Sequence, residues 1–279
     1  MQEFDSLQYI DAHVHLNFDQ FDDDQEEVIS EMKEEEIGAI NVGIDTRTSR
    51  ESVKLAEKHD HIWASVGCHP TEADDGFSNE PYQEMLKDDK DVVAVGECGL
   101  DYSRSEYRSD KKKQLQKDVF VSQITLAAKT DLPLILHIRP RKHSMDVYED
   151  GLDILTHFQN QTDTDLTGTA HFFVGNKNIA KQFLNLGFYI SFTGPLTQDT
   201  DLQEVCAYIP QDRLLAETDS PFAPPQSFSD SRNSPLAISL IAEKIADIKS
   251  LSADAMRKQL VVNTARLFSL GAVEKTGNL

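Results

Sequence analysis

The sequence contains few cysteines, and their placement indicates neither a disulfide framework nor a cysteine-based metal site. Cys68, Cys98 and Cys206 are an odd number and lie far apart in a chain of 279 residues. This usage fits a reducing compartment better than a small secreted domain held together by disulfides. Any metal site in this chain is therefore expected to use histidine and carboxylate ligands.

Long hydrophobic runs are missing as well. No apolar run approaches the roughly 20 residues that a membrane-spanning helix needs. The N-terminus is acidic and lacks the basic start and apolar run of a signal peptide. We therefore expect a cytoplasmic protein with no membrane partner, and nothing in the sequence indicates an obligate protein partner.

Positive charge is scarce relative to negative charge. The chain has 27 Lys and Arg against 48 Asp and Glu, for a net charge of −21. Such a balance repels nucleic acid at long range, so tight sequence-independent binding to duplex DNA is not expected. The preferred interpretation of the acidity is a contribution to solubility. An enzyme acting on a phosphate ester stays compatible with it, because metal ions reverse the local field.

Short apolar, β-branched runs recur along the chain and predict strands at 8–14, 37–44, 62–67, 92–96, 132–138, 167–173, 188–193 and 213–217. Stretches with helical periodicity lie between and after them, at 24–36, 48–59, 80–89, 111–130, 146–160, 176–186, 199–207 and 235–249. A further helix is predicted over 252–269, with Ser252 placed to cap it.

Strands that alternate with helices predict parallel pairing and right-handed crossovers. Eight such units predict an α/β fold, a single (β/α)8 TIM barrel with an additional C-terminal helix. We expect one domain over residues 1–279, with a core from about 8 to 270 and a frayed tail after about 271. A doubly wound open sheet is the alternative, but no Gly-x-Gly-x-x-Gly follows an early strand.

Histidines and acidic residues gather at the predicted strand ends. In the stretch "DAHVH", alternation places His13 and His15 on one face of a strand, together with Asp11. A lone His-x-His is common in ordinary strands. Later strands, however, run into His69, Glu97, Asp101, His137, Arg139, His171, Glu217 and Asp219. Because the carboxyl ends of barrel strands meet at one rim, these side chains are predicted to share a site.

The residue types suit divalent metals. Imidazole and carboxylate bind borderline and hard cations, so Zn, Mg, Mn and Ni are all compatible. We predict two ions, with one held by His13, His15 and Asp219, the other by His137 and His171, and Glu97 bridging them. Two metals activate water and polarise a phosphoryl oxygen. Asp219 is the candidate to orient or deprotonate that water.

Two neighbours of these ligands have less certain roles. His69, which precedes Pro70, is interpreted as a turn residue, as a contact to a substrate phosphate, or as a hydrogen-bond donor that supports a ligand from behind. Cys98 follows Glu97 directly and so points to the opposite face of the strand, where packing is its expected role.

The motif series as a whole resembles the TatD family of metal-dependent deoxyribonucleases. The similarity is carried in order by "DAHVHL", "VGCHP", "VGECGLD", "LPLILHIR", "HFF", "ISFTG", "LLAETDSP" and the "RN" at 232–233. The spacing of Gln114, Phe120 and Gln123 also resembles that family's helix before the fifth strand. The resemblance extends from residue 9 to about 268.

This resemblance implies a TIM-barrel hydrolase related to the amidohydrolase superfamily. It implies divalent-metal-dependent cleavage of phosphodiester bonds in DNA, with single strands or frayed ends as the expected substrate. The family's metal positions fall on His13, His15, Glu97, His137, His171 and Asp219. Its catalytic roles fall on Glu97, Asp219 and His69, and its substrate contacts on His69 and Arg139.

The sequence departs from the family pattern at three positions near these motifs. Pro140 follows the arginine of "LHIR" where many members carry Asp, Ser234 stands where Glu is common, and Phe222 stands where Tyr is common. None of the three is a proposed ligand, so the departures bear on substrate preference and rate.

Substrate contacts beyond these are left open. One basic group comprises Arg104, Arg108 and Lys111–Lys113, and a smaller one Arg141, Lys142 and His143. Either contacts a nucleic-acid backbone or is an ordinary solvated surface. Bases could stack on Tyr102, Phe172, Phe173 or Phe222, and the sequence does not choose among them.

Two other functions remain open for such a site. The first is an amidohydrolase-type enzyme that cleaves a C–N, lactone or ester bond with the same metal pair. That group often bridges its metals with a carbamylated lysine, whereas the fourth strand here supplies Glu97. The second is a non-enzymatic barrel that binds metal or a partner, which predicts that ligand substitutions leave function intact.

Overall fold

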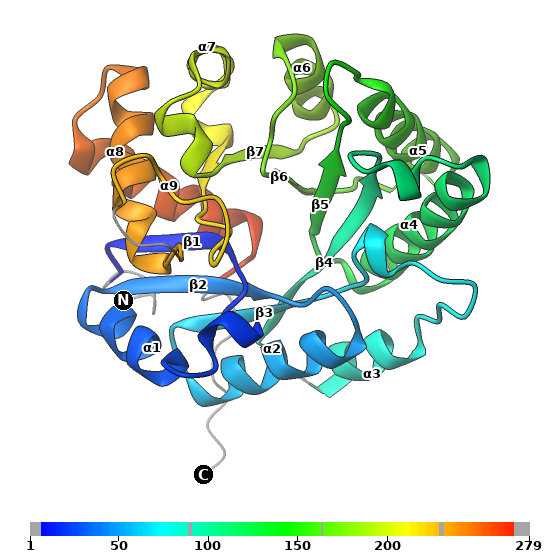
Figure 1. The fold of residues 1–279 in the computed structure, drawn as a ribbon, viewed down its shortest axis with the longest axis horizontal. Helices are drawn as coiled ribbons and strands as arrows, with labels where there is room; N and C mark the ends of the chain where they lie inside the picture. Colours follow the sequence, from blue (N-terminus) through cyan, green and yellow to red (C-terminus); the bar gives the residue numbers. More distant parts are fainter. Residues whose placement is uncertain (1–6, 89–90, 163, 229–231, 271–279) are drawn as a thin grey trace.

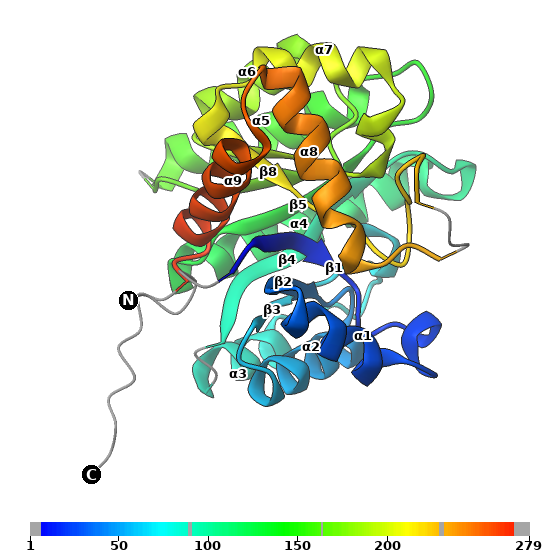
Figure 2. The ribbon, with the colours of Figure 1, turned by 90° about the vertical axis from the view of Figure 1, so that its left-hand side faces the viewer.

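A nearly closed array of parallel strands surrounded by helices forms the body of the chain. The computed structural model describes residues 7–88, 91–162, 164–228 and 232–270. Its strands form one eight-stranded sheet in the order β1-β2-β3-β4-β5-β6-β7-β8, all neighbours pairing in parallel. Helices lie around this nearly closed barrel (Figures 1 and 2). The predicted (β/α)8 architecture is confirmed, and the open doubly wound sheet is not.

The strands are β1 Tyr9–Val14, β2 Ile37–Val42, β3 Ile62–Val66, β4 Val92–Asp101, β5 Leu134–Arg139, β6 Gly168–His171, β7 Tyr189–Phe192 and β8 Leu214–Ala216. The helices are α1 Gln25–Glu34, α2 Thr46–Lys58, α3 Glu80–Asp88, α4 Asp110–Thr130, α5 Asp146–Thr162, α6 Lys177–Asn185, α7 Thr200–Tyr208, α8 Ile238–Lys249 and α9 Ala253–Leu267. Among the described helices, none has both the length and the apolar composition to cross a membrane. The tail predicted after about 271 lies outside the described residues.

The fourth strand is longer than predicted, because pairing resumes after a break. The register between β4 and β5 shifts between Val95 and Cys98, and the ladder then continues to Asp101, which pairs with Arg139. The segment "GECGLD" is therefore strand rather than loop. Cys98 is fully buried in the core outside the barrel, as alternation predicted, while Glu97 faces the interior.

The first and last strands meet where the chain leaves them. The backbone N–H of Asp219 donates to the carbonyl of His13 at 3.0 Å, and that of His15 donates to the carbonyl of Ser220 at 2.9 Å. Residues more than 200 positions apart in sequence are thereby fixed side by side at the carboxyl-end rim of the barrel.

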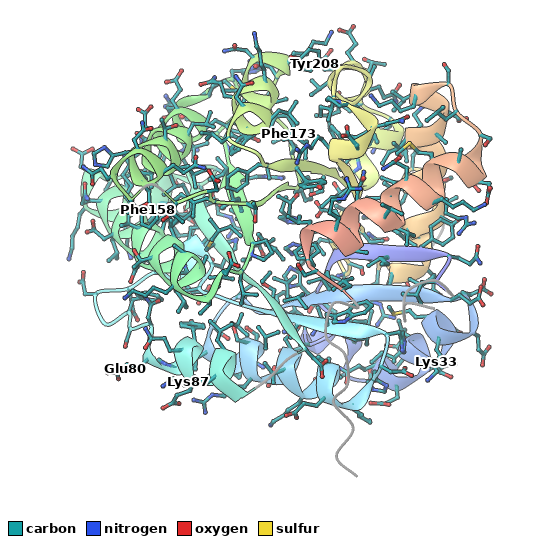
Figure 3. The ribbon with its side chains drawn as sticks, turned by 180° about the vertical axis from the view of Figure 1, so that it is seen from behind. Lys33, Glu80, Lys87, Phe158, Phe173 and Tyr208 are labelled. Atoms are coloured by element: carbon teal, nitrogen blue, oxygen red, sulfur yellow. The ribbon has the colours of Figure 1, made fainter. Side chains whose placement is uncertain are left out.

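The additional C-terminal helix is present and closes the opposite end of the barrel. Apolar side chains of α9, including Val261 and Ala265, join one buried cluster with Ile10, Ile135 and Leu215 from the strands. The hydroxyl of its N-cap, Ser252, accepts from the N–H of Ala255 at 3.3 Å, as predicted. Seen from behind, this red helix crosses the strands (Figure 3). The bottom of the barrel is thus plugged, which leaves the carboxyl-end rim open for a site.

Two buried glutamines of α4 hold the backbone around the rim. Gln123 accepts from the N–H of Cys68 and donates to its carbonyl, both at 2.8 Å. Gln116 binds the backbone of Asp101 in the same way, at 3.0 and 3.3 Å. Since a buried amide is stable only when hydrogen-bonded, these pairs fix the positions of the segments that carry His69 and Asp101.

Candidate metal centre

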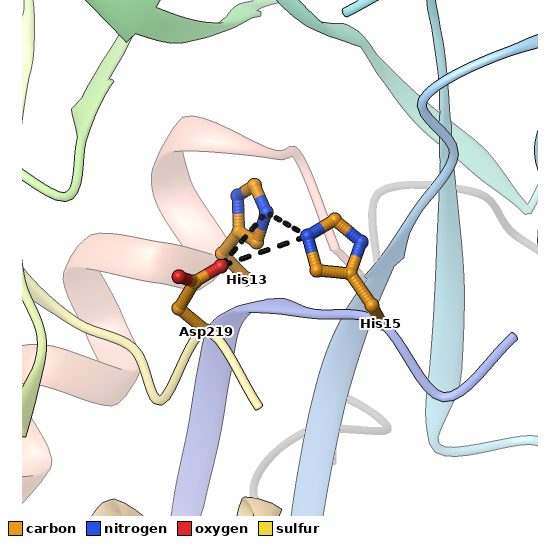
Figure 4. A group of neighbouring side chains, drawn as sticks. All are labelled: His13, His15 and Asp219. Carbon is orange, nitrogen blue, oxygen red and sulfur yellow. Dashed lines mark hydrogen bonds and ion pairs between the residues drawn. The ribbon is translucent and has the colours of Figure 1, made fainter. Parts of the chain in front are cut away.

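Two histidines at the end of β1 and an aspartate after β8 form the first half of the site. The Nε2 atoms of His13 and His15 lie 3.1 Å apart, and both face Oδ1 of Asp219, at 3.7 and 3.6 Å (Figure 4). All three residues are buried. The structure therefore brings together the three residues that the sequence predicted for one metal ion.

The carboxylate of Glu97 lies between two groups of imidazoles. Its Oε2 is 3.5 Å from Nε2 of His13 and 3.7 Å from Nε2 of His15. Its Oε1 is 2.6 Å from Nδ1 of His137 and 3.6 Å from Nε2 of His171. Each oxygen thus faces a different set of ring nitrogens, which is the arrangement that a bridging carboxylate needs.

His137 and His171 each reach Glu97 but stay apart from one another, with ring centroids 6.5 Å apart. The ring of His171 stacks on His13 at 3.5 Å, whereas His137 lies 4.2 Å from His69. Ligand atoms of His69, Glu97 and His137 consequently form a compact group of their own. His69, which we expected to contact substrate, thus stands at the edge of the predicted second metal position.

Asp11 does not share the face of His13 and His15, contrary to the prediction from strict alternation. The register between β1 and β2 shifts between Asp11 and Val14, where β1 contains one extra residue. The extra residue reverses the face of the strand on which the following side chains lie. The carboxylate accepts instead from the N–H of His13 and from the N–H and hydroxyl of Thr218, at 3.2, 2.9 and 2.5 Å. Burial raises the pKa of Asp11 to about 8, against the effect of these hydrogen bonds. Its role is to join β1 to the segment after β8.

The first group of atoms fits a divalent ion. Among His13, His15, Asp219 and Glu97, five interatomic distances run from 3.1 to 3.7 Å. A tetrahedron with such edges has its centre roughly 2.1–2.2 Å from each corner, which is the bond length that zinc makes to nitrogen and oxygen. The donors present therefore suit a resident metal in both type and spacing.

The outer nitrogen of His15 sets which of its ring nitrogens faces the site as an acceptor. Nδ1 of His15 lies 3.0 Å from the carbonyl of Val42, which can only accept, so Nδ1 carries the proton and Nε2 presents its lone pair to the site. Nδ1 of His171 lies 2.9 Å from the carboxylate of Glu217, which favours a positive charge on this ring. His137 differs, since its Nε2 lies 3.3 Å from the carboxylate of Asp101 and its Nδ1 faces Glu97.

Comparison with known proteins identifies the family. The family model described as "TatD related DNase" matches residues 10–269. The chain belongs to the TatD family. Along with its relatives, it is a metal-dependent hydrolase.

Individual relatives cover nearly the whole chain. A Bacillus subtilis protein named uncharacterized metal-dependent hydrolase YabD is 36% identical over 264 residues, which are 93% of this chain and 98% of that protein. A Pantoea ananatis protein named 3'-5' ssDNA/RNA exonuclease TatD is 30% identical, over 93% of this chain and 99% of its own. Among solved structures, the TatD homologue YjjV of Escherichia coli K12 superposes with a TM-score of 0.83 at 27% identity, covering 94% of this chain and 98% of that one.

The charges of the TatD-family site are strongly coupled. Burial opposes ionisation of Glu97, but the imidazoles around it hold the pKa of this carboxyl well below its usual range. Burial and the neighbouring His137 lower the pKa of His69 to about 3. Burial also disfavours a charged His171, yet Glu217 and then Glu97 raise the pKa of this ring to about 9. The site therefore stabilises ionised carboxylates at neutral pH and keeps His69 uncharged.

Glu217 and Asp101 contact rings of the candidate ligands, although the sequence assigned them no role. Both stand at strand ends. Glu217 lies two positions before Asp219, so the two-residue period of a strand would have placed both side chains on the same face. Glu217 is fully buried and also accepts from the N–H of Phe172 at 2.6 Å. Glu217 and Asp101 are placed to orient the rings of the candidate ligands and not to bind a metal themselves. Sequence spacing cannot make this distinction, because it depends on interatomic distances.

Replacing Glu217 by glutamine is expected to weaken metal binding by about 10- to 100-fold, because the amide no longer fixes His171 as a proton donor at Nδ1. The free energy of unfolding should change much less than the metal affinity. Competition with a chelator measures that affinity. Glu149→Gln, on the exposed face of α5, is the matched control and should bind metal as the wild type does. Equal affinities for the two variants would contradict the role assigned to Glu217.

The site opens into a cavity of about 870 Å³ at the rim. Its lining includes Arg104, Arg139, Phe172 and Phe222 as well as the ligands. Among the described residues, no carboxylate pairs with Arg104 or Arg139, and the guanidinium of Arg139 lies 4.4 Å over the ring of Phe172. Phe172 is held at φ 44°, a left-handed conformation that is costly for a bulky residue and that recurs at binding sites.

Proposed function

We propose that this TatD-family hydrolase cleaves phosphodiester bonds in DNA, at single strands or frayed ends, with two divalent ions at the carboxyl-end rim. The observation that carries the proposal is the placement of Glu97, whose two oxygens face separate groups of imidazoles. One ion is assigned to His13, His15 and Asp219, the other to His137 and His171, with Glu97 shared. The likeness to a relative named as an ssDNA/RNA exonuclease supports the substrate class.

The metal pair supplies Lewis acidity, which lowers the pKa of water and neutralises charge on the phosphoryl oxygens. The residues of the chain provide the orientation. Histidine rings at the ends of β1, β5 and β6 would hold the ions, and Asp219 would accept a proton from the attacking water. Burial raises the pKa of Asp219, but the surrounding histidines outweigh burial and lower this pKa, which keeps the carboxylate ionised for that role.

His69 is suited to donate a hydrogen bond to the substrate. The N–H of Thr71 donates to Nδ1 of His69 at 3.2 Å, so the neutral ring carries its proton on Nε2. That nitrogen points into the site, 3.8 Å from Oε1 of Glu97. An N–H there stabilises charge that develops on a phosphate oxygen. Arg139, which has no carboxylate partner among the described residues, is assigned to the adjacent phosphate.

A local excess of positive charge explains how an acidic protein holds a polyanion. The net charge of −21 repels DNA at a distance. The cavity lining carries Arg104 and Arg139 against the four carboxylates Glu72, Glu97, Asp101 and Asp219, so the positive charge there depends on bound metal ions. With the metal charges added, the field inside the cavity is positive. We therefore infer weak binding to DNA in general and productive binding only at the rim, in one domain formed by residues from about 8 to 270.

The competing amidohydrolase-type function lacks one structural feature. No lysine is among the described residues that line the cavity, so a carbamylated lysine bridge has no source there. Cleavage of a C–N, lactone or ester bond is therefore an outcome to be tested rather than the preferred proposal.

Metal analysis combined with a nuclease assay tests the proposed function. The purified protein is loaded with Mn²⁺, Zn²⁺, Ni²⁺ or Mg²⁺ in turn, its ions are counted, and cleavage of an end-labelled single-stranded oligonucleotide is followed before and after chelation. We expect about two ions per chain, activity that chelation removes and metal restores, and slower cleavage of a blunt duplex. Two ions without phosphodiester cleavage would exclude the proposal and favour the amidohydrolase-type alternative.

A further inference from the structure

An aromatic wall leads from a metal ligand to the outside of the cavity. The ring of Phe18 stacks on His15, with centroids 4.3 Å apart and an angle of 16°. Phe222 meets Phe18 edge to face at 6.0 Å and lies 6.2 Å from His15. The residues after β1 and β8 thus present three rings in succession, from the buried site to the mouth.

Only one ring of this wall is substantially exposed. The side chain of Phe222 is 44% accessible although the cavity beside it is lined with charged groups. Among the other rings that the sequence offered for stacking, Tyr102 and Phe173 are buried, and Phe172 has one face covered by Arg139. Single exposed rings are common on protein surfaces, so it is the position of Phe222 in the cavity lining, beside Phe18, that makes it a candidate to stack on a ligand.

The exposed ring stands on a fixed backbone. The N–H of Phe222 donates to the carbonyl of Asp219 at 2.8 Å, and the side chain of Asn233 donates to the carbonyl of Phe222 at 2.6 Å. Asn233 is buried and also binds the carbonyl of Thr218 at 2.9 Å. The ring is therefore held in place before any ligand arrives, which reduces the entropy lost on binding.

The cavity is asymmetric in its chemistry. Phe18 and Phe222 occupy the side after β1 and β8, while Arg104 and Arg139 occupy the side after β4 and β5. Glu97 and the imidazoles lie between the two sides. A nucleotide has the same polarity, with an apolar base at one end and a phosphate at the other.

We propose that Phe222, supported by Phe18, is a stacking subsite for an unpaired nucleobase next to the scissile phosphate. The subsite rests on the proposed function, because a base lies there only if a nucleic-acid phosphate lies at the metals. Stacking on a ring face tolerates any base but requires that the base be unpaired. Phe222 is thus a specificity-determining residue that selects single strands and frayed ends without reading sequence.

The test combines an enzyme substitution with a substrate substitution. Phe222→Ala should lower kcat/KM on a single-stranded oligonucleotide by about 5- to 150-fold, mainly through KM, the range that one stacked base provides. The same assay is repeated on oligonucleotides with an abasic site placed in turn on each side of the scissile phosphate. At one of these positions, wild type and Phe222→Ala should have equal kcat/KM, because the base that stacks on Phe222 is missing. Phe222→Trp should restore or strengthen binding, which rules out a fault of folding.

Tyr208→Ala is the matched control, since this ring on α7 is 45% exposed and lies away from the cavity, at the periphery (Figure 3). It should cleave as the wild type does. If DNA is cleaved but Phe222→Ala binds and cleaves normal and abasic strands like the wild type, the stacking subsite is wrong.

A binding measurement distinguishes failure of the stacking subsite from failure of the proposed function. The anisotropy of a labelled oligonucleotide, recorded for the same variants and abasic strands, reports stacking without cleavage. Binding that depends on Phe222 and on one base, with no hydrolysis in any preparation, would overturn the proposed function and leave the subsite supported. Binding that depends on neither would overturn the subsite.

Discussion

Glu97→Ala is expected to abolish hydrolysis and to reduce the metal content from two ions per chain to one or fewer. The carboxylate faces both halves of the site, so its removal takes a ligand from each ion and leaves the imidazoles without a shared anion. The rate should fall by about 10³-fold or more, as is usual when a positioned charge is lost from an active site. Metal analysis and the single-strand nuclease assay measure the two effects.

Two further variants make this result interpretable. Glu149→Ala, on the exposed face of α5, removes a glutamate that is not among the residues lining the cavity and should keep both metal and activity. Glu97→Gln has nearly the volume of the wild type and so separates loss of charge from loss of packing. Full turnover in Glu97→Ala, or an unchanged metal content, would remove the bridging role.

Asp219→Asn is expected to lower kcat by about 10²- to 10⁴-fold, the usual contribution of a general base. The loss of metal should be smaller than in Glu97→Ala, because an amide oxygen still faces His13 and His15, while it no longer accepts a proton. Asp219 sits at φ 54°, in a left-handed conformation that asparagine tolerates well, so the backbone should be preserved. Steady-state kinetics with saturating metal measure the change.

The matched control for this variant is Asp201→Asn, an exposed aspartate of α7. It should leave kcat unchanged. If Asp219→Asn turned over at the wild-type rate with its metals bound, proton transfer would have to be assigned to another group.

The barrel and its rim were predictable because both follow from periodicity and topology. Alternating strand and helix patterns require parallel pairing, and parallel strands place their carboxyl ends together. For this reason His13 in the first strand and Asp219 after the last could be assigned to one site before any distance was known. The opposite orientations of Glu97 and Cys98 followed from the same two-residue period.

Irregularities in the strands could not be predicted from periodicity and topology. The shift in register after Asp11 turned this carboxylate away from the site, and the shift before Cys98 extended β4 to Asp101. Both depend on how one strand pairs with its neighbour, which the sequence of a single strand does not encode. Glu217 was visible at a strand end, but its role depends on a 2.9 Å contact to His171.

Exposure of the aromatic rings was likewise a tertiary property. Tyr102, Phe173 and Phe222 all lie in segments that follow strands at the rim, yet two are buried and one lies open at the cavity mouth. Which of them faces solvent is determined by the helices and loops that pack around the rim. The choice among the stacking candidates therefore required the structure.

Anomalous X-ray scattering from crystals grown with Mn²⁺ tests the central claim most directly. We expect two anomalous peaks, one among His13, His15 and Asp219 and one near His137 and His171, with a different oxygen of Glu97 bound to each. A single peak, or two peaks of which neither contacts Glu97, would contradict the shared carboxylate on which the proposed function depends.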